Sequence, residues 1–291
     1  MKLTDLFIKG KYVVTGEVGP PKGVRAEETL KGARIMGEVV DAVNVTDNQS
    51  AVMRLGSLAV SRLLKEAGIE PVFQLTCRDR NRLGLQSELL SAAALGVENA
   101  LIITGDHMAL GDHPEAKKVF DLDSVQLLAV ARGLNEGHDL AGHDLESRPD
   151  LCLGAVVNPG SDEVETQLIK MEKKIEAGAQ FFQTQAVYDP EVFARFMKQA
   201  DAFGIPVMVG IVPLKSAGMA RYMTENIAGV RVPEEMVKRM VGASRADRRK
   251  ISSELAIDLI QKMKDMCQGV HLMPLWWDDL VPEIVRATGI R

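Results

Sequence analysis

The stretch EVETQLIKMEKKIEAGAQFFQTQ, residues 163–185, contains the structural unit that repeats along the whole chain. A helical pattern covers residues 163–177 and stops before Gly178, a residue type that commonly ends helices. Residues 181–185 then form a short run with the composition of a strand. A glycine at a helix end, followed within a few residues by a strand, is typical of αβ connections. The stretch therefore predicts a helix packed beside a buried strand.

The same alternation of strand and helix extends from one end of the chain to the other. The strand candidates are rich in Val, Ile and Phe and nearly continuous in apolar character, as strands covered on both faces of a parallel sheet are. They are residues 12–17, 42–46, 72–75, 100–104, 151–156, 181–185, 206–211 and 270–273. Further helices are predicted at residues 57–67, 87–95, 191–203, 217–227 and 233–267, the last interrupted around 244–248.

Eight strands, each followed by a helix, predict an α/β protein with a single closed (βα)8 barrel, a TIM barrel, in one domain over residues 1–291. The alternative is an open doubly wound sheet, which is disfavoured because no early GxGxxG turn occurs and the alternation continues to the C-terminus. Residues 105–120 follow the fourth strand, so we expect them on the catalytic face. Residues 138–150 precede the fifth strand and should lie at the opposite end.

Composition places the chain among ordinary globular proteins, with 46% hydrophobic and 26% charged residues. The net charge is -5 and the basic residues are spread along the chain, which argues against nucleic acid or an anionic membrane as the main partner. The N-terminus MKLTDLFIKGK is too short and too charged for a signal peptide. Cys77, Cys152 and Cys267 form no CxxC pair and are expected to be buried free thiols. These features predict a cytoplasmic protein without membrane insertion.

Polar residues follow the predicted strands, at the end of such a barrel where the chemistry takes place. They are Glu17, Thr46, Asp47, Asn48, Gln74, Thr76, Thr104, Asp106, Asn158 and Gln185. Most are uncharged hydrogen-bonding groups, and no His, Cys and carboxylate cluster has metal-ligand spacing, so no metal is expected. His271 also lies at a strand end, where structural and functional roles are equally compatible with it. His107 and His113 lie in the polar segment 105–120 and are interpreted as solvated.

Among these polar residues, Glu17 is the strongest candidate for a catalytic role. It lies in TGEVGPP, at the end of an apolar strand and before a Gly-Pro-Pro turn. Enclosure by the barrel walls would favour the neutral form of its carboxyl group, which a general acid requires. The alternative is a solvated or salt-bridged glutamate. Asp106 has a weaker case, because Gly-Asp turns are common and usually structural.

Three lysines lie on the helix after the fifth strand. They are Lys170, Lys173 and Lys174. Surface solvation is one interpretation of these residues. Their position past Asn158 would also allow them to hold a phosphate or the anionic edge of a ring.

Seven motifs in a fixed order indicate a family. They are VVTGEVGPPKG (13–23), VNVTDN (43–48), PVFQLTCRDRN (71–81), NALIITGDH (99–107), KMEKKIEAGAQFFQTQAVYD (170–189), GIPVMVGIVPL (204–214) and GVHLMPLW (269–276). Each alone is weak. In this order and at these spacings, the chain resembles the methylenetetrahydrofolate reductase family over residues 1–290.

The resemblance implies a flavin enzyme that passes a hydride to the methylene carbon of 5,10-methylenetetrahydrofolate and so produces 5-methyltetrahydrofolate. Glu17 aligns with the family's general acid, and Asp106 with its aspartate beside the flavin and the pterin. Gln185 aligns with its folate-contacting glutamine. The positions implied for the cofactor are Thr46, Gln74, Thr104, Gly105, Asp106, Asn158, Ser161, Lys170, Lys173 and Lys174. The flavin carries the redox chemistry, and the barrel orients it and excludes water.

The chain departs from the familiar bacterial members of the family at several positions. Gln74 replaces a His, Thr104 replaces an Arg, and Gln167 replaces an Asp that contacts the flavin. Ala186 and Ala217 replace aromatic residues. The loss of the Arg and of the Asp near the cofactor makes FMN an alternative to FAD. The loss of aromatics weakens the stacking surface for a nicotinamide, so either NAD(P)H or a partner subunit could supply the electrons. An oligomer is expected.

Two other functions compete with the reductase. One is a pterin-binding methyltransferase barrel that moves a methyl group to a corrinoid, and the other is a non-catalytic barrel subunit of a larger redox complex. Glu17 before its Gly-Pro-Pro turn and the GlnThrGln strand favour the reductase over the first. The presence of Glu17, Asp106 and Gln185 together disfavours the second.

Overall fold

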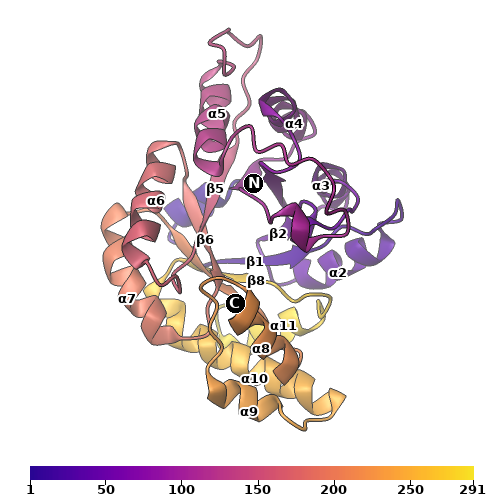
Figure 1. The fold of residues 1–291 in the computed structure, drawn as a ribbon, viewed down its shortest axis with the longest axis vertical. Helices are drawn as coiled ribbons and strands as arrows, with labels where there is room; N and C mark the ends of the chain where they lie inside the picture. The colour runs from indigo at the N-terminus through magenta and orange to yellow at the C-terminus, as the bar shows by residue number, and fades with distance from the viewer.

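The computed structural model describes residues 1–291 and contains eight parallel strands that close into a barrel in the order β1 to β8 (Figure 1). The strands are β1 (Val13–Val18), β2 (Ala42–Val45), β3 (Pro71–Thr76), β4 (Asn99–Ile103), β5 (Cys152–Val157), β6 (Phe181–Ala186), β7 (Val207–Ile211) and β8 (Gly269–Leu272). Because β1 pairs with both β2 and β8, the sheet has no free edge. The predicted barrel is confirmed, and the alternative of an open sheet is wrong.

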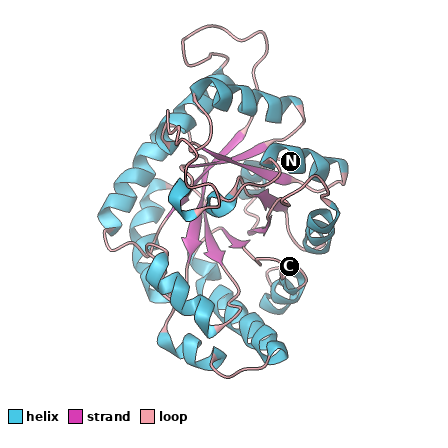
Figure 2. Ribbon diagram, turned by 45° about the vertical axis from the view of Figure 1, so that its right-hand side comes forward, coloured by secondary structure: helices cyan, strands magenta, loops and turns pink.

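Helices surround the strands on the outside of the barrel (Figure 2). They are α1 (Leu3–Ile8), α2 (Glu27–Gly37), α3 (Ser57–Glu66), α4 (Arg82–Ala94), α5 (Ser124–Glu136), α6 (Val164–Glu176), α7 (Pro190–Ala200), α8 (Ala217–Asn226), α9 (Glu234–Met240), α10 (Arg245–Met263) and α11 (Leu280–Thr288). None of these helices is both long enough and apolar enough to cross a membrane. The three cysteines are free and buried, as predicted.

The predicted strands differ from the observed ones by at most one residue at either end. No predicted helix range covers α1, α2, α5 or α11. The helix α4 begins at Arg82, rather than at residue 87, because the side chain of Asn81 accepts a hydrogen bond from the Gly84 amide and caps it (3.0 Å). The long predicted element 233–267 is divided into α9 and α10. Gly242 adopts a left-handed conformation (φ 73°) and Ser244 caps α10, so the division lies just before the expected interruption.

The interior of the barrel is apolar at one end and polar at the other. Alternate residues of each strand point inward. At the N-terminal end, α1 closes the barrel, where Leu3 and Leu6 pack against inward-facing residues such as Val13, Phe181 and Met208. The opposite strand faces pack against the helices in a separate, larger cluster. The polar inward residues lie further along the strands, so hydrogen-bonding groups collect at the C-terminal end.

The two irregular segments lie at opposite ends of the barrel, as predicted. Segment 105–120 follows β4 and contributes Gly105 and Asp106 to the cavity described below. Segment 138–150 precedes β5, and its last residue, Asp150, forms a salt bridge with Lys2 beside the closed end.

Candidate active site

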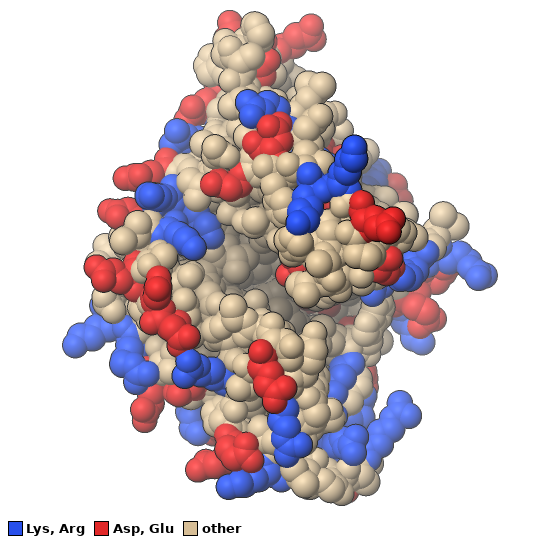
Figure 3. Space-filling view, viewed as in Figure 1, with Lys and Arg blue, Asp and Glu red and all other residues tan.

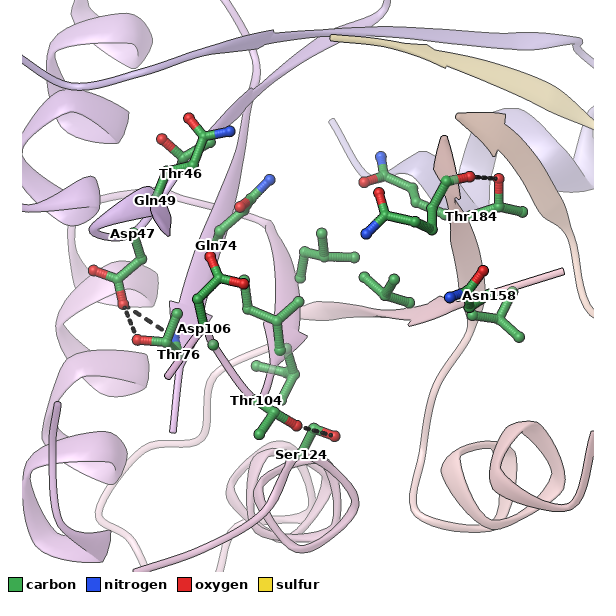
Figure 4. Close-up of a pocket in the computed structure, with 18 of the residues that line it drawn as sticks. Thr46, Asp47, Gln49, Gln74, Thr76, Thr104, Asp106, Ser124, Asn158 and Thr184 are labelled. Atoms are coloured by element: carbon green, nitrogen blue, oxygen red, sulfur yellow. Dashed lines mark hydrogen bonds between the residues drawn. The ribbon is translucent and has the colours of Figure 1, made fainter. Parts of the chain in front are cut away.

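A cavity of about 400 Å³ opens at the C-terminal ends of the strands. The face seen in Figure 3 is hollowed near its centre. Nine of the residues predicted to act in catalysis or to bind substrate or cofactor line this cavity: Glu17, Thr46, Gln74, Thr104, Gly105, Asp106, Asn158, Lys174 and Gln185. They come from six different strands or from the loops and the helix that follow them, and Figure 4 shows several of them around the hollow. The barrel thus brings residues that are far apart in the sequence to one site.

Glu17 is largely buried and has two polar neighbours. Its side chain is only 10% exposed. Its Oε2 atom accepts a hydrogen bond from Gln74 Nε2 (3.1 Å) and lies 3.5 Å from His271 Nε2. No lysine or arginine pairs with it. The side chain is therefore enclosed rather than solvated, and His271 is the one side chain placed to form an ion pair with it.

Beneath Glu17 lies a buried layer of polar side chains. His271 Nδ1 is 2.9 Å from Thr15 Oγ1, and Gln183 Nε2 lies 3.3 Å from the same hydroxyl. Gln183 also exchanges two hydrogen bonds with the amide of Asn44 (2.8 and 3.2 Å). This network fixes the His271 ring so that its other nitrogen faces Glu17.

The sequence is compatible with either a structural or a functional His271, and Thr15, Asn44 and Gln183 were not predicted as part of the site. One signal was available, because Thr15 and Glu17, like Gln183 and Gln185, are two residues apart on a strand. Residues with that spacing point to the same side of a sheet.

Asp106 lies on a turn whose preceding residue, Gly105, must be a glycine. Gly105 has a φ of 90°, and a Cβ atom there would lie 3.0 Å from the Cβ of Thr76. Asp106 is exposed, and its Oδ2 atom accepts a hydrogen bond from the Ser50 amide (3.0 Å). Figure 4 shows Asp106 near Gln74 on the wall of the cavity. Asp106 and Glu17 therefore line the same cavity from different strands.

A buried arginine, which the sequence analysis missed, connects three loops around Asp106. The side chain of Arg78 is 1% exposed and forms two hydrogen bonds of 2.7 Å with the carboxylate of Asp79. Its guanidinium also donates to the main-chain oxygens of Asp106 and Asn48 (both 3.2 Å). Arg78 thereby ties the loops after β2, β3 and β4 together.

Two polar residues at the end of β2 have structural roles. Both carboxylate oxygens of Asp47 accept hydrogen bonds from Arg80 (2.8 and 3.3 Å), and Oδ2 also accepts from Thr76. The Thr76 contact is drawn in Figure 4. The Asn48 side chain donates to Asp79 and accepts from the Arg54 amide. These groups are already satisfied within the protein.

Other polar groups in the cavity wall have hydrogen-bonding or charge capacity that the protein leaves unused. Lys174 Nζ donates to the Val156 carbonyl (2.6 Å) but pairs with no carboxylate. Burial, together with the nearby charge of Lys170, lowers the pKa of Lys174 to about 8. The hydroxyl of Thr46 and the side-chain oxygen of Asn158 are buried without a hydrogen bond. Unsatisfied buried groups are costly, so the wall is suited to a polar ligand with negative charge near Lys174.

Three of the predicted cofactor residues lie outside this cavity. Ser161 lines a neighbouring cavity of about 550 Å³ together with Arg195 and Arg231. Lys170 and Lys173 are exposed on α6. No group of three His, Cys, Asp or Glu side chains is arranged to bind a metal ion.

The five positions that depart from the bacterial pattern are divided between the cavity and its surroundings. Gln74, Thr104 and Gln167 line the cavity, and Gln167 accepts a hydrogen bond from the Asn158 amide (3.4 Å). Ala186 is buried outside the lining, and Ala217 begins α8.

The Lys174→Met variant of the ligand-free protein is expected to be more stable than the wild type at pH 7 by up to about 3 kcal/mol. In the unfolded chain Lys174 titrates near 10.5, and in the folded protein near 8. The unfolded state therefore binds more protons between these values, and the contribution of Lys174 to stability rises with pH across that window. The advantage of the variant should vanish by about pH 10.5.

Urea unfolding at a series of pH values would measure this difference. Lys173→Met is the matched control, because Lys173 is exposed on the same helix. The difference in free energy of unfolding between Lys173→Met and the wild type should not change with pH. If the difference for Lys174→Met were equally independent of pH, burial would not disfavour the charged form of Lys174.

Comparison with known proteins agrees with the motifs. The sequence profile of the family described as methylenetetrahydrofolate reductase matches residues 2–289. The 5,10-methylenetetrahydrofolate reductase of Pectobacterium carotovorum is 25% identical, over 98% of this chain and 92% of its own. Methylenetetrahydrofolate reductase 2 of Schizosaccharomyces pombe is 26% identical over the whole chain, which spans only 48% of that protein.

Solved structures share the fold at low sequence identity. A Clostridium thermocellum protein described as binding two copies of 5-methyl-5,6,7,8-tetrahydrofolic acid superimposes with a TM-score of 0.66 at 14% identity, over 99% of both chains. An F420-dependent secondary alcohol dehydrogenase gives a TM-score of 0.56 at 15% identity, over 96% of this chain and 99% of its own. These likenesses concern the barrel, whereas the family follows from the sequence profile. The chain belongs to the methylenetetrahydrofolate reductase family.

Proposed function

We propose that this chain reduces 5,10-methylenetetrahydrofolate to 5-methyltetrahydrofolate with a flavin bound at the mouth of its barrel, and that one domain, residues 1–291, carries both sites. The observation that carries the proposal is that Glu17, Asp106 and Gln185 line one cavity. Membership in the family supports the same reaction.

Glu17 is proposed as the general acid that opens the five-membered ring of the substrate. Both of its contacts, with Gln74 and His271, are made by Oε2. The other oxygen is left to carry a proton and to donate it to the nitrogen that leaves the methylene carbon. A positioned acid of this kind contributes about 10²–10⁴-fold to a rate.

Asp106 and Gln185 are proposed to hold the substrate. Ring opening leaves a cationic iminium, and the carboxylate of Asp106 would stabilise that charge. Gln185 Oε1 already accepts a hydrogen bond from the Ala186 amide (3.0 Å). Its amide nitrogen is therefore left to donate to an acceptor on the folate.

The cavity wall fits a flavin. When bound, the flavin would supply the hydride for the methylene carbon. Lys174 offers a cation without a carboxylate partner, and the buried Thr46 hydroxyl offers a hydrogen bond that the protein leaves unmade. We propose that Gln74, Thr104, Gly105 and Asn158 complete this binding wall, since they line the same cavity. Ser161, Lys170 and Lys173 would contact only a part of the cofactor that extends outside it.

The test begins with the absorbance spectrum of the purified chain and the mass of the small molecule that heating releases. A flavin spectrum is expected, and the mass distinguishes FAD from FMN. The protein, reduced with dithionite, should then be reoxidised by 5,10-methylenetetrahydrofolate with formation of 5-methyltetrahydrofolate. Colourless protein that moves a methyl group to a corrinoid would overturn the proposal in favour of a methyltransferase.

The electron donor is tested in the same preparation. Bleaching of the flavin by NADH or NADPH would identify a nicotinamide donor. If neither bleaches it while dithionite does, the donor is a partner protein.

A further inference from the structure

The loop after β8 carries an exposed tryptophan in an unfavourable backbone conformation. Trp276 is 57% exposed. Its φ is 75°, and that of Leu275 is 49°. Both values lie in the left-handed region, which side chains other than glycine rarely adopt. Strain of this kind persists only where the surrounding structure imposes it, and it is concentrated at functional sites.

Neighbouring elements impose this conformation. Lys215, in the loop after β7, donates a hydrogen bond to the Leu275 carbonyl. The Trp277 ring lies 5.1 Å from Lys215 Nζ and 5.0 Å from Arg249 Cζ, so two cations pack against it. Asp279 forms a salt bridge with Arg249. Trp277 therefore anchors the loop, while Trp276 stays exposed to solvent.

Trp276 does not itself line the cavity, but it lies at the rim, close to a residue that does. A Cβ atom built on Gly19 would be 3.5 Å from Cζ2 of Trp276 and 3.8 Å from Oγ1 of Thr46. The Trp276 ring and the Thr46 hydroxyl thus both lie within 4 Å of the same position beside Gly19. Thr46 lines the cavity. Met273, on the same loop, lines it as well. The guanidinium of Arg54, which pairs with no carboxylate, lies 6.0 Å from the Trp276 ring centre.

We propose that Trp276 binds the benzoyl ring of the folate at the point where the bound substrate extends out of the cavity. Arg54, beside Trp276, would pair with the carboxylates beyond that ring. The identity of the ligand rests on the proposed function. A cavity of about 400 Å³ is small for a flavin ring and a whole folate together, so the end of the folate distant from the pterin must extend over the rim. Aromatic side chains bind flat rings by offset stacking, and Trp276 is the exposed aromatic residue at that rim.

The test compares Trp276→Ala with the wild type. KM for 5,10-methylenetetrahydrofolate is expected to rise roughly tenfold, the effect typical of one lost aromatic contact, with kcat unchanged. Trp276→Phe should recover most of the loss. With a tetrahydropterin substrate that lacks the benzoylglutamate, wild type and Trp276→Ala should behave alike. Tyr222→Ala is the matched control, because Tyr222 is an aromatic residue of similar exposure (61%) on a different element, α8.

Stability separates binding from folding. Trp276→Gly relieves the left-handed strain, so its thermal midpoint should not fall below that of the wild type, although its KM should rise as in Trp276→Ala. An unchanged KM in both variants, in a wild type that reduces folate, would overturn this proposal alone. A wild type that neither binds nor reduces the folate would overturn the proposed function together with it.

Discussion

Glu17→Gln is expected to lower the rate of methylenetetrahydrofolate reduction by about 10²–10⁴-fold, the contribution of a positioned general acid. Glutamine has nearly the same shape, and its side-chain oxygen can still accept the hydrogen bond from Gln74 Nε2. It has no proton to transfer to the departing nitrogen. The measurement is a single turnover, in which protein reduced beforehand is mixed with the substrate and the flavin absorbance is followed.

Two comparisons make this result specific. Reduction of the flavin needs no proton from Glu17, so that step should keep its rate in the variant. Glu70→Gln is the matched control: Glu70 is also 10% exposed, but it lies at the closed end of the barrel and pairs with Lys65 (3.0 Å). Its substitution should lower stability and leave the turnover rate unchanged. A Glu17→Gln protein with the full rate would remove Glu17 from the mechanism.

The barrel was predictable because its signals are local. Each buried strand is a short apolar run, and the glycines that end the helices precede the next strand directly. Once the strands are located, the topology places their C-terminal residues at one end. Glu17 and Gln185 could therefore be assigned to a common site before any coordinates were known.

Contacts between distant residues could not be predicted in the same way. His271 meets Thr15 across 256 positions of the sequence, and Asn44 meets Gln183 across 139. No local sequence pattern predicts which residues a buried polar side chain will contact. Arg78 illustrates the same limit, because an arginine after a strand has the same sequence appearance whether it is exposed or, as here, 1% exposed.

The positions of the lysines of α6 were predictable only in part. The sequence allows the same two interpretations for Lys170, Lys173 and Lys174, yet only Lys174 lines the cavity. Met171, which is buried, precedes Lys174 by three residues, and that spacing places both on one face of the helix. Helical geometry could thus have separated Lys174 from Lys173, but not from Lys170, which lies four residues earlier on the same face and still is exposed.

Asp106→Asn is expected to lower the rate of folate reduction on the order of 10²-fold, the effect typical of removing one electrostatic contact from a transition state. Asparagine keeps an oxygen that can accept the hydrogen bond from the Ser50 amide, so the turn should remain in place. Only the negative charge opposite the iminium is lost. The exposure of Asp106 does not argue against this role, because a bound substrate would exclude water and strengthen the interaction.

Asp112→Asn separates the charge of Asp106 from the position of its loop. Asp112 lies in the same segment, 105–120, and accepts a hydrogen bond from the Met53 amide (3.0 Å), much as Asp106 does from Ser50. It does not line the cavity. If the carboxylate of Asp106 acts on the substrate, Asp112→Asn should keep the wild-type rate in single-turnover assays, and Asp106→Asn should not. Equal losses in the two variants would mean that loop anchoring, rather than charge, accounts for the effect.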